Sequence, residues 1–183
     1  GNIFFLLFNR FLVIIYGAYL KFISLKSDDR GTILVFNLKM KSEIHIELFE
    51  KHEKVNFYTV RFNNGETEVD KFFGKFPENS QYNEDVNIVI KWIDNIGERG
   101  AYERYFRREG KISDNVMALP TPIETSNLRL YVIRLSEEIV ILGNGGVKNT
   151  RTYNEDPFLN QCVELLQAVD RLLKKSISLD KTQ

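Results

Sequence analysis

Two apolar runs separated by a short polar break dominate the second half of the chain. Residues 128–135 are dense in β-branched, aliphatic and aromatic side chains, residues 136–138 are Ser-Glu-Glu, and residues 139–142 are again wholly apolar. Two such runs joined by a few polar residues are typical of a β-hairpin. A glycine-rich segment over 143–146 (GNGG) and a polar, basic stretch over 147–153 come next. We therefore expect the hairpin to be the centre of the domain, with any chemistry beside it and the glycines permitting a bulge or a tight turn.

Elsewhere the spacing of apolar positions separates helices from strands. Apolar residues recur every three or four positions over 68–76, 82–96 and 157–175, the pattern of a helix that buries one face. Asp156 and Pro157 suit the start of the last helix, and Cys162 falls on its apolar face as a small core residue. Short or alternating apolar runs predict strands over 32–38, 44–49, 55–62 and 116–119. We expect an α+β fold in which a small, mainly antiparallel sheet packs against two or three helices, with an extra N-terminal β-containing segment.

The most apolar stretch of the chain is at residues 3–24, where Arg10 interrupts it. The unbroken run over 11–20 is short for a helix that spans a membrane, and no small-residue cleavage site of a signal peptide follows it. A buried structural element, a membrane or export segment, and an extension ahead of a start at Met40 all remain open. We expect residues 1–39 to be an apolar, dispensable extension and residues 40–183 to form one α+β domain.

Composition narrows the classes of function. Lys+Arg and Asp+Glu both number 25 in 183 residues, so no global charge attracts nucleic acid or an anionic membrane. The single cysteine excludes an internal disulfide, which fits a cytoplasmic location. His45 and His52 could hold zinc only if carboxylates completed the ligand set, and their spacing is not that of a usual zinc site, so we expect no metal.

A local basic and aromatic patch lies in the connector over 98–115. Its tyrosines and phenylalanine alternate with cations, of which we single out Arg104, Arg107, Arg108 and Lys111 as RNA-binding candidates. Such a mixture suits RNA phosphates and stacked bases. It suits equally well a connector whose aromatic side chains enter the core and whose arginines are solvated.

An ordered set of short motifs runs through the second half: Ala118-Leu119-Pro120, Leu128-Arg129-Leu130-Tyr131, IVILG over 139–143, VKNTRT over 147–152, and Pro157. On these motifs, residues 80–175 resemble the RelE/HigB superfamily, the toxins of type II toxin–antitoxin pairs. The resemblance implies a RelE-like fold and a cytoplasmic protein that cuts mRNA on the ribosome. It also implies a helix-turn-helix antitoxin as partner, admits a homodimer, and calls for no metal, organic cofactor or membrane.

The resemblance also carries residue roles. Arg129 would clamp the phosphate, Lys148 and Arg151 would add positive charge, and Tyr153 would orient the nucleotide or act as the acid. Cations suit this reaction because negative charge grows on the phosphoryl oxygens in the transition state. Arg134, five residues beyond Arg129 on the same strand, should point to the opposite face.

Other interpretations of these residues stay open. The base could be Glu155 or Asp156, although Asp156 also suits the cap of the last helix. Arg129 could instead pair with Glu137 or Glu138 across the hairpin, and the basic turn could simply be solvated. The neutral charge and Asn149, at the place of a family lysine, favour an alternative: a non-catalytic RelE/ParE-fold module that inhibits a target or only pairs with an antitoxin. A membrane-attached protein is a third hypothesis, if residues 3–24 insert.

Overall fold

A mixed β-sheet runs through the whole described part of the chain. The computed structural model describes residues 20–28, 31–38, 42–119 and 127–180, with side chains over 44–119 and 127–176. The sheet contains eight strands in the order β1-β2-β3-β4-β8-β7-β6-β5. Their bounds are β1 Leu20–Asp28, β2 Gly31–Leu38, β3 Ser42–Lys51, β4 Asn56–Phe62, β5 Arg107–Arg108, β6 Val116–Leu119, β7 Leu128–Arg134 and β8 Ile139–Val147.

The helices follow the two halves of the sheet. Their bounds are α2 Glu68–Gly74, α3 Asn83–Arg99 and α4 Pro157–Asp180, with short 3₁₀ turns at Glu103–Tyr105 and Tyr153–Glu155. All neighbouring strands pair antiparallel except β4 and β8, which are parallel. The α+β class and the hairpin of β7 and β8 are therefore confirmed. In the described ranges, no helix is long and apolar enough to cross a membrane.

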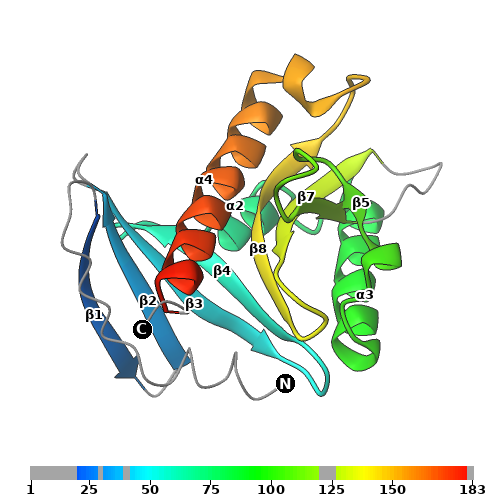
Figure 1. The fold of residues 1–183 in the computed structure, drawn as a ribbon. Coiled ribbons are helices and arrows are strands. Elements are labelled where there is room, and N and C mark those ends of the chain that lie inside the picture. The colour runs from blue at the N-terminus through cyan, green and yellow to red at the C-terminus, as the bar shows by residue number, and fades with distance from the viewer. Residues whose placement is uncertain (1–19, 29–30, 39–41, 120–126, 181–183) are drawn as a thin grey trace.

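The two faces of the sheet bury separate hydrophobic clusters. On β7, Leu128, Leu130 and Val132 pack with residues of α2 and α3, whereas Tyr131 and Ile133 pack with residues of α4. This division follows from the alternation of side chains along a strand. Figure 1 shows α4 crossing in front of the sheet, with α2 behind it. The β7–β8 hairpin is thus covered on both faces, which explains why both strands are almost wholly buried.

Three features differ from the expectation or extend it. The strand expected to end at residue 142 continues to Val147, so the glycine-rich segment lies inside β8. Residues 20–28, in the stretch left open by the sequence, form β1. Because β2 pairs with β3, the sheet continues across the expected boundary at residue 39. Whether residues 1–39 are dispensable stays a prediction, and residues 1–19 lie outside the described ranges.

Candidate functional site

A bulge at the centre of the hairpin shapes the candidate site. Leu130 pairs with Gly145 and Val132 pairs with Leu142, so Tyr131 lies opposite two residues of β8. One extra residue on a strand is a β-bulge, as the glycines led us to expect. A Cβ atom at Gly145 would stand 1.9 Å from the carbonyl oxygen of Arg129, so only glycine allows this approach of the two backbones.

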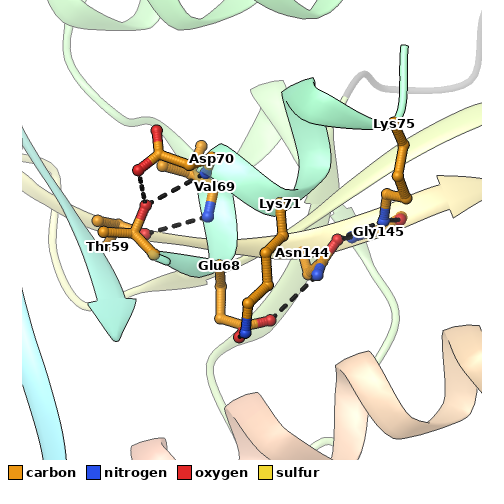
Figure 2. Close-up of polar contacts among 9 residues, drawn as sticks. Thr59, Glu68, Val69, Asp70, Lys71, Lys75, Asn144 and Gly145 are labelled. Atoms are coloured by element: carbon orange, nitrogen blue, oxygen red, sulfur yellow. Dashed lines mark hydrogen bonds and ion pairs between the residues drawn. The ribbon is translucent and has the colours of Figure 1, made fainter. Parts of the chain in front are cut away.

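Beyond the bulge, a polar network from α2 holds the end of β8. β4 pairs with β8 only as far as Leu142. Further along, the Lys75 ammonium donates to the Asn144 Oδ1 and to the Gly145 carbonyl, both at 2.5 Å. Asn144 Nδ2 donates to Glu68 Oε2 at 3.1 Å, and Figure 2 shows the side chains of Glu68 in α2 and of Lys75, directly after it, reaching Asn144. The strand that leads to Lys148 is therefore fixed on its open edge.

Arg129 and Lys148 come together with Arg107 and Glu109 in what we call the cationic cluster. Arg129 and Lys148 are buried, at 6% and 8% exposure. Burial lowers the pKa of the Arg129 guanidinium, Arg107 lowers it further, and Glu109 raises it. Burial also lowers the pKa of Lys148. Glu109 raises this pKa, and Arg107 and Arg129 lower it. The charge of Arg129 therefore reaches Lys148, and both cations feel the charges of Arg107 and Glu109. That the two cations form one site stays a prediction.

Glu109 is the carboxylate inside the cationic cluster. Its side chain is only 6% exposed, and its Oε1 lies 3.2 Å from Arg107 Nε. Arg107 and Arg108 are neighbours on β5 and point to opposite sides. Arg108 donates to Glu103 at 2.9 Å and to the Asp114 carbonyl at 3.3 Å. Of the two arginines, Arg107 therefore joins the cluster.

Two tyrosines extend the cluster toward α4. Tyr131 is fully buried, and its hydroxyl has no hydrogen-bond partner within the described part of the chain. Burial moves the pKa of Tyr131 well above its usual value, and Glu109 raises it further. The Tyr153 ring packs against Tyr131 with centroids 6.4 Å apart, and burial raises the pKa of Tyr153 as well. Both phenols therefore stay protonated and can donate a hydrogen bond to an anion.

The other predicted site residues lie elsewhere. Arg151 and Lys111 are exposed. The Arg104 guanidinium stacks on Tyr102 and Tyr105, 4.8 Å and 4.9 Å from their ring centroids. The hydrogen bond from Arg104 lowers the pKa of Tyr105. Arg104 thus belongs to an aromatic surface separate from the cationic cluster.

The opposite direction of Arg134 is confirmed. Its Nε donates to the carbonyl of Ala101, which belongs to the core on the α3 face. The suggested pairing of Arg129 with Glu137 or Glu138 is wrong, because Arg129 lies opposite Gly146, at the far end of the hairpin from that turn.

Both carboxylates that the sequence suggested as a base already accept hydrogen bonds from nearby groups of the chain. Glu155 Oε1 accepts hydrogen bonds from the amide and hydroxyl of Thr152, which lower the pKa of Glu155. Asp156 Oδ1 accepts from the amides of Phe158 and Leu159, which confirms it as the cap of α4. Glu109 is a further carboxylate beside the cations, and only its position between Arg108 and Gly110 in a basic stretch hinted at it. Tyr131 was visible in the hairpin motif but reads there as a core residue.

The cationic cluster has the chemistry of an anion site: three cations, two protonated phenols and one carboxylate on the face of the sheet covered by α4. No protein-family model, curated protein or solved structure matches the chain.

Proposed function

We propose that the chain is a metal-independent endoribonuclease of the RelE/HigB toxin type, and that the cationic cluster is its phosphate-binding site. The convergence of Arg107, Arg129 and Lys148 carries the proposal. Two buried cations and the part-exposed Arg107, with a single enclosed carboxylate, favour an anionic ligand, because such a ligand offsets the repulsion among the cations. We also propose that the α+β fold is of the RelE type.

The residues of the cluster suit cleavage by an internal hydroxyl. Glu109 accepts the proton of the RNA 2′-hydroxyl, whose oxygen then attacks the neighbouring phosphorus. Arg129 and Lys148 stabilise the charge that develops on the phosphoryl oxygens. Tyr153 donates its proton to the departing 5′-oxygen, so the products are a 2′,3′-cyclic phosphate and a free 5′-hydroxyl. No metal or organic cofactor takes part in this scheme.

The proposal extends to the setting of the reaction. The substrate is mRNA on the ribosome in the cytoplasm, and a helix-turn-helix antitoxin encoded beside the gene blocks the site. Exposed Lys111 and the stack of Arg104 on its tyrosines would contact the flanking RNA, since arginine and aromatic planes accept bases. Arg151 would add charge at the rim.

One observation favours a second function. Arg129 and Lys148 expose only 6% and 8% of their surface, which leaves little room for a polynucleotide. A non-catalytic module of the same fold, which inhibits a target or pairs with an antitoxin, would need no access to these groups.

Primer extension on cellular mRNA after induction tests the proposal. The wild-type chain should generate new 5′ ends, and Glu109→Gln and Lys148→Met should abolish them. Lys91→Met, at an exposed position of α3, is the matched control and should cleave like the wild type. The wild-type chain could instead arrest growth without generating new 5′ ends, and Lys148→Met could arrest growth equally. That result would contradict the nuclease and support the non-catalytic binding module.

A further inference from the structure

We infer that a divalent transition-metal ion of the zinc class binds between the β3–β4 turn and α3, held by Glu50, His52 and Asp94. Each residue offers one ligand atom, and the three atoms lie within 4.8 Å of one another. The site does not depend on the proposed function, because it lies at the hairpin-turn end of β8, away from the cationic cluster.

The fold brings the three side chains together from two elements. Glu50 lies near the end of β3 and His52 directly follows the strand, and their side chains meet with Nε2 3.3 Å from Oε1. Asp94 lies three residues before Gly97, on the same face of α3. A backbone hydrogen bond joins the β3–β4 turn to α3, because the Lys54 amide donates to the Gly97 carbonyl at 3.0 Å.

The imidazole of His52 is held in place before any ion arrives. A Cβ atom at Gly97 would lie 2.3 Å from His52 Cγ, so the ring rests on the helix where a side chain is missing. The imidazole also packs edge-on against the ring of Phe57, with the two centroids 5.4 Å apart. This contact limits rotation of the imidazole. The ring of His52 is thus positioned by packing, as a metal ligand in a preorganised site should be.

The hydrogen bonding of His52 points to a missing ligand. Its Nε2 is buried and has no hydrogen bond within the described part of the chain. That nitrogen lies 3.3 Å from Glu50 Oε1, a contact whose geometry does not make a hydrogen bond. A metal ion between the nitrogen and the carboxylates would satisfy all three ligand atoms.

The ligand set and its spacing suit zinc. One imidazole and two carboxylates leave a fourth, open position for water. Zinc bonds of about 2.1 Å in a tetrahedron place ligand atoms about 3.4 Å apart. The cluster therefore closes around the ion by a movement on the order of 1 Å, which the 48% exposed side chain of Glu50 can make.

Calorimetry on the full, untagged chain, stripped with EDTA and titrated with zinc chloride, tests the inference. One ion should bind per chain, and Asp94→Asn and His52→Gln should each weaken binding at least tenfold. Glu53→Gln removes an exposed charge from the same turn and should leave binding unchanged. Absence of binding to the wild type, or equal loss in Glu53→Gln, overturns the site, as does tighter binding of magnesium or calcium than of zinc.

Thermal unfolding supplies a second readout that does not need the histidine variant to be stable. Because zinc would join the β3–β4 turn to α3, saturating zinc should raise the Tm of the wild type by several degrees. Asp94 is exposed, so Asp94→Asn should fold normally and show no such rise. An equal rise in both proteins would place the ion elsewhere and overturn the inference.

Discussion

Asp114, in the turn between β5 and β6, accepts a hydrogen bond from the side-chain amide of Gln167 on α4 at 2.8 Å. The same carboxylate accepts from the backbone amides of Lys111 at 2.8 Å and Val116 at 3.0 Å. Asp114 thus closes its own turn and fastens it to α4. Because Glu109 lies at the start of this turn, the contact also positions the carboxylate of the cationic cluster.

Replacing Asp114 with alanine should destabilise the protein by about 2–3 kcal/mol, since two backbone amides and the buried Gln167 amide lose their acceptor. Urea unfolding followed by circular dichroism measures the change. Glu78→Ala removes a carboxylate at an exposed position and should change the free energy of unfolding by less than about 0.5 kcal/mol. A loss below about 1 kcal/mol for Asp114→Ala would mean that the turn does not depend on this contact.

Two glycines should respond in opposite directions to the same added methyl group. At Gly145 the new Cβ would meet the Arg129 carbonyl at 1.9 Å, whereas at Gly74 it would meet nothing within 4 Å. Gly145→Ala should therefore cost about 3 kcal/mol or prevent folding, because the β7–β8 backbones must separate. Gly74→Ala, in α2, should stabilise by about 0.5–1 kcal/mol. Melting temperatures of the two variants check the prediction, and a neutral Gly145→Ala would contradict the bulge.

The thiol of Cys162 should be inert in the folded protein. Cys162 lies in the α4 core, and burial raises its pKa to about 11. The unfolded chain, with the ordinary pKa of about 8.5, ionises first as the pH rises. The protonated thiol of Cys162 therefore stabilises the folded state in full below the pKa of the unfolded chain. This stabilisation is lost as the pH rises through about 11. Thiol titration at pH 8 should show slow reaction without urea and fast reaction with it; rapid labelling of the native chain would contradict the burial.

The sequence predicted those features that depend on local pattern. The β7–β8 hairpin, α3 and the capping of α4 by Asp156 follow from periodicity and from the polar groups at the end of a helix. The opposite directions of Arg129 and Arg134 follow from strand alternation alone. Each of these inferences needs only residues that are close together in the chain.

Features that depend on distant contacts were missed. Glu109 enters the cationic cluster because β5 is an edge strand beside β6, and its two residues carry no strand pattern of their own. Asp94 reaches the β3–β4 turn only through the docking of α3 there, which no spacing of histidines reveals. The length of β8 was underestimated because glycines normally weaken strands, whereas here Gly145 is required by a close backbone approach.

Removing the Tyr131 hydroxyl should separate ligand binding from stability. The hydroxyl is buried and has no hydrogen-bond partner in the described residues, so Tyr131→Phe removes a desolvated polar group without breaking a bond. The variant should be as stable as the wild type or more stable by up to about 1 kcal/mol. If the hydroxyl serves a phosphate bound in the cationic cluster, affinity for a short RNA should fall about fivefold, the equivalent of one hydrogen bond. Fluorescence anisotropy with a labelled oligonucleotide and urea unfolding measure the two effects, with Lys91→Met as control. Destabilisation beyond 1 kcal/mol, or unchanged RNA affinity, would show that the hydroxyl serves the core and not a ligand.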